Sequence, residues 1–249
     1  MPVSASLLAA SGAVRIASLN LCTDEYLLLA ASRTQIASVS RLAADRDDSP
    51  LWRVARGIPV NNGTLEDIIA QRPTILLTMG GGGRSTRELA KRLGIQTVDL
   101  HFPQSIDDVV SNLEIVARLS GQQAAVPRWK WRVRQLQASK PAPRPAAFVG
   151  QGGTTVSATS LAASWMTLAG LRQMALPGGK VSAEWLMTDA PPILLKSNYR
   201  ARQMSQGRRW LDQPWVREAN SRIIETDGRP WTCAGPLMPY EIERLRGLL

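Results

Sequence analysis

The residues of this sequence best suited to chemistry form a glycine-rich turn. Gly80 to Gly83 follow an apolar run and lead into Arg84 and Ser85, where a helix is expected to begin. A helix N-terminus presents free backbone N–H groups and the positive end of the helix dipole, which together suit an anion. The spacing matches neither a Walker phosphate loop nor the dinucleotide-binding GxGxxG loop. The turn therefore predicts contact with an anionic ligand, and the alternative is a turn that binds nothing.

Catalytic and metal chemistry have few residues to use. The chain contains one histidine, His101, two cysteines, Cys22 and Cys233, and no G-x-S-x-G motif. A thiol–imidazole pair would require one cysteine to meet His101, and nothing near either cysteine in the sequence supports that. One histidine and two cysteines do not complete a transition-metal site without several carboxylates. We therefore predict a non-enzymatic protein with no metal site and no cofactor of its own.

Positive charge dominates the composition. The 249 residues include 30 Lys and Arg against 20 Asp and Glu, which gives a net charge of +10. The chain is 44% hydrophobic, which excludes a disordered tail protein, and no apolar run is long enough for a membrane span. The charge would attract nucleic acid, an anionic membrane surface or a small anionic ligand.

A basic stretch in the middle of the chain raises the nucleic-acid hypothesis. No acidic residue lies between Ile115 and Ala183, and within residues 128–134 Arg and Lys alternate with Trp129 and Trp131. Aromatic and basic side chains together are typical of a phosphate-binding face. The segment is expected to be helical, however, and alternate residues of a helix point to different sides. We predict no nucleic-acid partner and keep a basic, nucleic-acid-associated α/β protein as the alternative from another class.

Strands and helices must alternate to position these residues. Apolar runs predict buried strands at residues 15–20, 36–40, 74–78, 97–102, 146–149, 193–195 and 222–226. Helical patterns lie between them at residues 24–32, 64–72, 85–93, 105–119, 127–138 and 239–249. A polar loop is expected from Arg41 to about Gly57. The alternation indicates an α/β fold with mostly parallel sheets.

An internal repeat divides the chain into two lobes. Residues 64–78 align without gaps to residues 182–196, and Glu66 and Glu184 match within them. The order helix, proline, strand is common in α/β proteins, so chance is the alternative. The matched glutamate and the shared order of elements further along favour duplication. The repeat therefore predicts two α/β lobes joined by a helical segment, and a ligand is expected in the cleft between the lobes.

The predicted boundaries place the lobes on either side of that helical segment. The first thirteen residues are small and apolar like the end of a secretory signal, and a disordered N-terminus is the alternative. The parts are a residual signal or disordered segment at 1–13, an N-terminal lobe at 14–104, a bridging helix at 105–140 and a C-terminal lobe at 141–249.

The order and spacing of these segments resemble one family, the periplasmic substrate-binding proteins of ABC importers for ferric siderophores, heme and vitamin B12. The resemblance covers about residues 15–249, and no single motif is diagnostic. It rests on Arg15–Asn20 with Thr23–Glu25, Ile36–Ser40, Leu65–Leu77, the helix from Ser105 and Val181–Leu195. It implies two α/β lobes bridged by a long helix, a monomer located in the periplasm, and an ABC permease as the partner.

The resemblance also implies how the protein would meet its permease. In this family a glutamate on each lobe docks onto arginines of the transmembrane subunits, and Glu66 and Glu184 occupy the matching places in the two repeats. The alternative is that each glutamate only stabilises the N-terminus of its own helix.

The ligand site implied by the resemblance lies in loops that follow strands of the two lobes. Its candidate residues are Cys22, Thr23, Arg41, Gly82, Gly83, Arg84, His101, Tyr199, Arg200, Arg229, Trp231, Thr232 and Cys233. The arginines would bind a carboxylate-rich or catecholate ferric chelate through charge-assisted hydrogen bonds, whereas Trp231 and Tyr199 would suit a flat macrocycle. The net charge favours a ferric siderophore, with the corrinoid cobalamin or heme as the alternative. Cys22 and Cys233 would face each other across the cleft, either as free thiols or as a disulfide.

Overall fold

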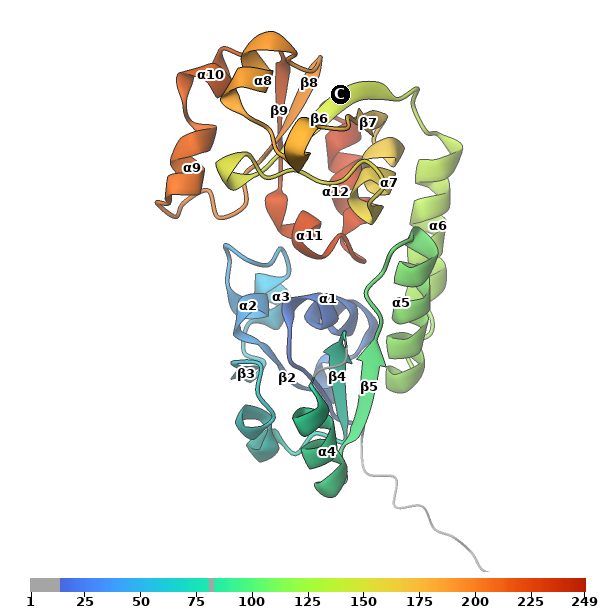
Figure 1. Cartoon of the computed structure of the whole chain (residues 1–249). Coiled ribbons are helices and arrows are strands. Elements are labelled where there is room, and N and C mark those ends of the chain that lie inside the picture. The colour runs from blue at the N-terminus through green and yellow to red at the C-terminus, as the bar shows by residue number, and fades with distance from the viewer. Residues whose placement is uncertain (1–13, 81–82) are drawn as a thin grey trace, which may run out of the picture.

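Two parallel sheets, each within its own lobe, organise the chain (Figure 1). The structure is a computed structural model that describes residues 14–80 and 83–249. The segment 1–13, predicted to be a residual signal or disordered, lies outside the described residues, as does Gly82. Every pairing between described strands is parallel, as the sequence predicted.

The first lobe contains a five-stranded sheet in the order β3-β2-β1-β4-β5. Its strands are β1 (Ile16–Ser18), β2 (Ile36–Ser40), β3 (Val60–Asn61), β4 (Ile75–Met79) and β5 (Gln96–Leu100). The helices between them are α1 (Leu21–Ala30), a 3₁₀ turn (Arg33–Gln35), α2 (Arg41–Ala44), α3 (Trp52–Ala55), a 3₁₀ helix (Glu66–Gln71) and α4 (Arg84–Arg92). The predicted loop after β2 therefore contains two one-turn helices. The predicted helix 64–72 is a short 3₁₀ helix that ends before Pro73, because a proline disfavours helical backbone in the preceding residue.

The second lobe contains a four-stranded sheet in the order β7-β6-β8-β9. Its strands are β6 (Arg144–Val149), β7 (Leu171–Gln173), β8 (Ile193–Ser197) and β9 (Arg222–Thr226). Its helices are α7 (Leu161–Leu168), α8 (Ala183–Thr188), α9 (Gln206–Leu211), α10 (Pro214–Arg217), α11 (Gly228–Cys233) and α12 (Met238–Arg246), with 3₁₀ turns at Gln151–Gly153 and Pro177–Gly179. The loop expected around Trp231 is thus the helix α11, whose N-cap is Asp227.

The two sheets repeat one arrangement. The order β2-β1-β4-β5 in the first lobe corresponds to β7-β6-β8-β9 in the second. The aligned segments of the internal repeat provide β4 and β8, which lie at equivalent positions in the two sheets. Glu66 and Glu184 lie in the first turns of the short helices that precede these two strands. The two segments that align in the sequence therefore form equivalent short helices and strands in the two lobes.

The segment predicted as a bridging helix forms two helices, α5 (Ile106–Ser120) and α6 (Ala125–Ala138), which run along one side of the molecule in Figure 1. Ser105 and Asp108 cap α5 reciprocally, as the sequence pattern indicated. Gly121, with φ of 69°, ends α5 in the left-handed region, where glycine is favoured. The helix α6 packs on α1 in the first lobe and on α12 in the second, so α6 joins the lobes.

The largest apolar cluster continues through α5 and α6 from one lobe into the other. It includes Ile16 of β1, Leu113 of α5, Trp129 of α6 and Trp165 of α7. The rings of Trp129 and Trp165 pack edge to face, 6.2 Å apart, and Trp129 Nε1 donates to the Pro236 carbonyl at 2.7 Å. Burial of this shared core holds the lobes against each other. Among the described helices, none has the length and apolar character that crossing a membrane requires.

Candidate ligand site between the lobes

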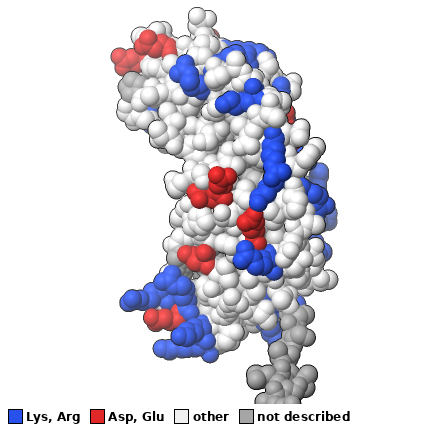
Figure 2. Space-filling model, turned by 90° about the vertical axis from the view of Figure 1, so that its right-hand side faces the viewer, with Lys and Arg blue, Asp and Glu red and all other residues white. Residues whose placement is uncertain are grey.

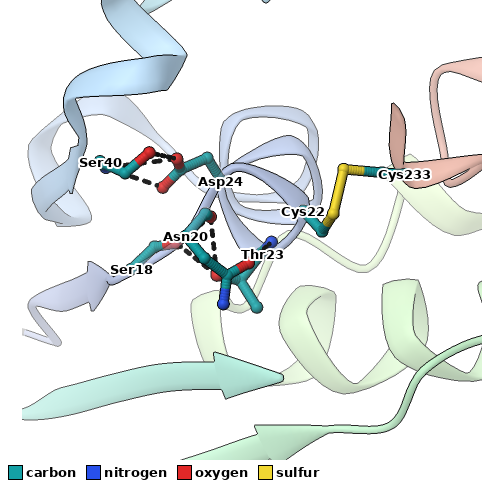
Figure 3. Close-up of a disulfide and its surroundings, with 7 residues drawn as sticks. All are labelled: Ser18, Asn20, Cys22, Thr23, Asp24, Ser40 and Cys233. Carbon is teal, nitrogen blue, oxygen red and sulfur yellow. Dashed lines mark hydrogen bonds between the residues drawn. A yellow bond between two sulfur atoms is a disulfide. The ribbon is translucent and has the colours of Figure 1, made fainter. Parts of the chain in front are cut away.

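A disulfide between Cys22 and Cys233 joins the two lobes (Figure 3). Cys22 lies in the first turn of α1, and Cys233 is the last residue of α11. Their Cα atoms are 5.4 Å apart, and 211 residues of sequence separate them. Of the two states left open by the sequence, the structure has the disulfide.

The first turn of α1 next to this disulfide is fixed from within the first lobe. Asn20 caps the helix by accepting from the Thr23 amide at 3.0 Å, and the hydroxyls of Ser18 and Thr23 lie 2.6 Å apart. Thr23 is completely buried. The hydroxyl of Thr23 is therefore occupied inside the first lobe, and contact between Thr23 and a ligand stays a prediction.

A second connection between the lobes consists of ion pairs. The Asp48 carboxylate, in the loop between α2 and α3, accepts from Tyr199 Oη at 2.7 Å and from Arg200 Nε and Nη2 at 2.7 and 2.9 Å. Oδ1 of Asp47 accepts from Nε and Nη2 of Arg202 at 2.9 and 2.6 Å. We call these five residues the interlobe clasp.

Arg229 adds a further contact beside the interlobe clasp. Its Nη1 donates to the Arg46 carbonyl at 2.9 Å, and its Nε and Nη2 bind the carboxylate of Asp227 at 2.8 and 2.6 Å. The predicted residues Tyr199, Arg200 and Arg229 are thus brought together, and they meet carboxylates of the protein itself.

Electrostatics favour the ionised state of the interlobe clasp. Burial raises the pKa of the Asp48 carboxyl, but the hydrogen bonds from Arg200 and Tyr199 and the nearby charge of Arg41 outweigh burial, so this pKa lies below its usual value. The pKa of Tyr199 is raised by burial and by its hydrogen bond to Asp48. The side chain of Asp48 is only 2% exposed, so solvent screens these interactions weakly.

A cavity of about 400 Å³ adjoins the interlobe clasp. Residues of both lobes line it: Arg46, Asp47, Asn198, Arg200, Ala201, Arg202, Asp227, Arg229 and Arg244. Two larger hollows, of about 540 and 610 Å³, lie beside α5 and α6 and between α8 and α10. Those hollows have no lining residues from two lobes, so the arginine-lined cavity is the candidate that matches the interlobe position expected for a ligand.

Two carboxyls that were not predicted as site residues, those of Asp24 and Glu25, are buried in α1. Burial raises the pKa of Asp24 to about 7, although hydrogen bonds from serines, among them Ser40, oppose the shift. Burial and the neighbouring Asp24 also raise the pKa of Glu25, whose oxygens have no hydrogen-bond partner among the described residues. A Cβ atom on Gly235 would lie 3.2 Å from Glu25 Oε2, so the second lobe packs closely over this carboxyl.

Several predicted ligand residues lie apart from the cavity or are not free to contact a ligand. Trp231 is buried, with its ring against Phe148 and its Nε1 donating to Thr226 Oγ1, and its stacking on a flat ligand stays a prediction. Thr232, next to the disulfide, is exposed. The Nε2 atom of His101 lies 3.6 Å from Oδ1 of Asp108 in α5.

The described end of the glycine-rich turn leads into a helix as expected, and neither Gly83 nor Arg84 lines the cavity beside the interlobe clasp. Gly83 is the N-cap of α4 with φ of 80°, and Arg84 is exposed in the first turn of that helix. Gly82 lies outside the described residues. Within residues 14–80 and 83–249, no group of three or more His, Cys, Asp or Glu side chains is arranged to hold a metal ion.

Sequence reasoning missed the acidic side of the interlobe clasp. Asp47 and Asp48 stand in a loop that follows the carboxyl end of a predicted strand, where ligand contacts are expected in parallel sheets. That position was a usable signal, but the partners of these aspartates lie about 150 residues further along the chain. Arg202 was missed for the same reason.

Solved structures share this architecture over nearly the whole chain. The periplasmic heme-binding protein HutB of Vibrio cholerae superposes with a TM-score of 0.73 at 17% identity, covering 94% of this chain and 98% of that one. The heme-binding protein RhuT from Roseiflexus sp. RS-1 superposes with a TM-score of 0.66 at 19% identity, covering 94% of this chain and 97% of that one. The vitamin B12-binding protein BtuF of Vibrio cholerae superposes with a TM-score of 0.64 at 18% identity, covering 94% of this chain and 97% of that one. The chain has the fold of these periplasmic binding proteins.

The periplasmic-binding-protein fold confirms the α/β, two-lobe architecture expected from the sequence. Neither a protein-family model nor a curated protein sequence matches the chain. At these identities the likeness concerns the fold, so the ligand has to be argued from the side chains of this chain.

Proposed function

We propose that this protein is a substrate-binding protein that captures an anionic ferric chelate between its lobes and delivers it to an ABC permease from the periplasm. The observation that carries the proposal is the cavity between the lobes, to which Arg46, Arg200, Arg202 and Arg229 contribute. Guanidinium groups bind carboxylates in bidentate fashion and remain charged at any physiological pH. Solved structures with the same fold include heme-binding, vitamin B12-binding and possible iron-binding proteins.

The chemistry of the cavity favours a carboxylate-bearing chelate such as a ferric siderophore. Trp231 is buried, and the disulfide holds α1 and α11 close together, so a flat macrocycle has no aromatic platform at the predicted position. A heme or cobalamin carrier is the second candidate, which the named neighbours favour.

Docking onto the permease is assigned to Glu66 and Glu184. Both side chains are exposed at equivalent places in the two lobes, and both carry an exposed apolar neighbour three residues later, Ile69 at 44% and Met187 at 71% exposure. A carboxylate beside an apolar side chain on each lobe would present two similar contacts to a symmetric pair of transmembrane subunits. We infer that the protein acts as a monomer in this complex.

The nucleic-acid alternative finds little support on the basic helix. Trp129 is buried, and Lys130 and Arg132 are paired with Glu114 and Glu243. Figure 2 shows the side of the molecule with α5 and α6, where Asp and Glu lie among the Lys and Arg and broad areas are neutral. A phosphate-binding face requires unpaired cations in a continuous strip. Enzymatic activity is not part of the proposal.

The test is a tryptophan-fluorescence titration with ferric citrate, a hydroxamate chelate, a catecholate chelate, heme and cobalamin. We expect saturable quenching by an anionic chelate, and we expect Arg202→Ala to weaken that binding about tenfold or more, because the loss of a charge-assisted hydrogen bond costs about 1.5–3 kcal/mol. Arg209→Ala, which removes an exposed arginine of α9 away from the cavity, is the matched control. Saturable binding of heme or cobalamin alone would favour the second candidate, and flat titrations with all five ligands would refute the proposal.

A separate measurement addresses docking. Transport of the bound chelate into vesicles that contain the cognate permease should fall strongly for Glu66→Gln with Glu184→Gln, because both lobes lose their docking charge. The affinity for the chelate should stay unchanged, because neither glutamate lines the cavity. Unchanged transport in this double variant would remove the docking assignment and leave chelate binding intact.

A further inference from the structure

We propose that the acidic loop of the first lobe is an intramolecular competitor for the ligand: Asp47 and Asp48 occupy a carboxylate-recognition site of the second lobe formed by Tyr199, Arg200 and Arg202. A carboxylate-bearing ligand binds this site by displacing the two aspartates. The inference rests on the proposed function, because it identifies the ligand groups that the interlobe site selects.

The recognition site is built by the second lobe alone. Gln151 Nε2 donates to the Tyr199 carbonyl at 2.9 Å, and the Tyr199 amide donates to Ser197 Oγ at 3.3 Å. A Cβ atom on Gly228 would lie 2.5 Å from the Cβ of Tyr199, so this glycine permits α11 to support the turn closely. Contacts within the second lobe therefore hold the turn that carries Tyr199 and Arg200.

The backbone at Arg200 is held in an unusual conformation. Its φ of 48° lies in the left-handed region, which costs a residue with a side chain about 1 kcal/mol. Hydrogen bonds on both sides fix the turn, from the Ala201 amide to the Asn198 carbonyl at 3.0 Å and from the Gln203 amide to the Arg200 carbonyl at 2.9 Å. Strain of this kind persists where the surrounding structure determines it, and it is frequent in binding sites. Here the guanidinium of Arg200 is directed at the other lobe.

The aspartates occupy this site as a ligand with two carboxylates would. Asp48 receives three hydrogen bonds, two from the guanidinium fork of Arg200 and one from the hydroxyl of Tyr199. Asp47, the adjacent residue, receives two from Arg202. Bidentate and charge-assisted contacts of this kind select planar carboxylates over other groups. The side chains therefore define a recognition site for a polycarboxylate.

The loop that supplies the aspartates is short and lies between two helices of four residues each, α2 and α3. Inside the loop the hydrogen bonds are turn contacts, from the Ser49 amide to the Asp45 carbonyl at 3.0 Å and from the Asp47 amide to Asp45 Oδ1 at 2.7 Å. Arg229 of the second lobe also donates to the Arg46 and Ser49 carbonyls at 2.9 and 3.4 Å, so the backbone of the loop stays attached when the aspartate side chains leave. The arginine-lined cavity next to it gives a ligand space to approach before the aspartates leave.

The disulfide strengthens this intramolecular competition. Cys22–Cys233 and the shared core keep the acidic loop beside the site, so the aspartates compete at a high effective concentration. The apparent affinity for a ligand is reduced by the fraction of molecules in which the site is occupied by the loop. Loss of the two carboxylates should therefore strengthen ligand binding. If the carboxylates were only a structural contact, their loss would weaken ligand binding.

The test compares the wild type with the double variant Asp47→Asn, Asp48→Asn, using two probes: ferric citrate and a peptide with the sequence of residues 45–49. We expect the dissociation constant for ferric citrate to fall about tenfold in the variant. The peptide should bind the variant and not the wild type, and Arg200→Gln in the variant background should abolish both gains. The control Asp189→Asn, Glu218→Gln removes two exposed carboxylates of the second lobe and should leave both affinities at wild-type values.

The outcomes separate this inference from the proposed function. Equal or weaker binding of both probes by the correctly folded double variant, as judged by near-UV circular dichroism, would overturn the inference. Peptide binding by the variant together with flat chelate titrations of both proteins would support the recognition site and refute the chelate function. If the wild type and the double variant bind the chelate with equal affinity, the proposed function stands, and the acidic loop makes only a structural contact with the second lobe.

Discussion

Asp24 and Asp48 are both buried aspartates of the first lobe, but their carboxyls meet opposite surroundings. Asp48 is paired with Arg200 and Tyr199, which hold its pKa below the usual value against the effect of burial. Asp24 receives hydrogen bonds from the hydroxyl and the amide of Ser40, which lower its pKa, but burial outweighs them and the pKa rises to about 7. The two residues therefore affect stability in different pH ranges.

Substitution of Asp24 should change how stability depends on pH. The ordinary pKa of this carboxyl is 3.8 and its pKa in the folded protein is about 7, so between these pH values the folded protein retains a proton on Asp24 that the unfolded chain has lost. Stability from this residue therefore falls as the pH rises through that window and is constant above it. We expect the melting temperature of Asp24→Asn to decline less steeply than that of the wild type between pH 4 and 7. The slope will not vanish, because the raised pKa of Glu25 acts in the same direction.

Asp48→Asn is the control for this measurement. The depressed pKa of Asp48 contributes stability that is lost only as the pH falls below the usual range of a carboxyl, so this variant should keep the wild-type slope between pH 5 and 7. Equal slopes for the wild type and Asp24→Asn would contradict the assignment. Neither pKa could be predicted from the sequence, because the burial of Asp24 depends on how the lobe packs and Arg200, which lowers the pKa of Asp48, is 152 positions away.

At the scale of elements, the central strands were predictable from the sequence, whereas the helix α11 was not. Buried apolar runs predicted the central strands of both sheets, because a strand covered on both faces is apolar throughout. The helix α11 was predicted as a loop, because it contains a glycine and a proline, which usually mark turns. Pro230 lies in the first turn of α11, where a missing N–H does no harm, and Asp227 caps the helix.

Gly228, the first residue of α11, connects this helix to the ligand site. A Cβ atom there would lie 2.2 Å from Ser197 Oγ and 2.6 Å from the Tyr199 amide nitrogen. Gly228→Ala should therefore push α11 away from the turn that carries Tyr199 and Arg200, and overpacking of this kind costs about 1–3 kcal/mol. We expect a lower melting temperature and weaker binding of ferric citrate, although Gly228 does not line the cavity.

Gly247→Ala is the matched control, because its Cβ would meet nothing closer than an ordinary contact of 3.4 Å in a helical conformation. Calorimetry and titration of both variants check the prediction. A Gly228→Ala protein with wild-type stability and affinity would show that α11 does not support the site.

At the scale of the whole molecule, the disulfide, the interlobe clasp and the shared core all join the same two lobes. The sequence predicted the two lobes through their repeat, since a repeat is visible in the order of residues. It left the state of the cysteines open and gave no sign of the pairing of Asp48 with Arg200, which are 152 residues apart. Such contacts depend on how the lobes are oriented, and the packing of α6 against α1 and α12 sets this orientation.

Removal of the disulfide should therefore loosen the lobes without unfolding them. The loop that it closes spans 211 residues, and restriction of an unfolded chain of that length is worth about 5 kcal/mol in the chain-entropy model. We expect Cys22→Ser with Cys233→Ser to melt at a lower temperature and to show a larger radius of gyration by small-angle scattering, because the interlobe clasp opens more often when the disulfide is absent. The wild type under reducing conditions should match the variant. Because the acidic loop then competes less effectively, ferric citrate should bind the variant more tightly than the oxidised wild type, and equal affinity with unchanged dimensions would show that the core alone fixes the lobes.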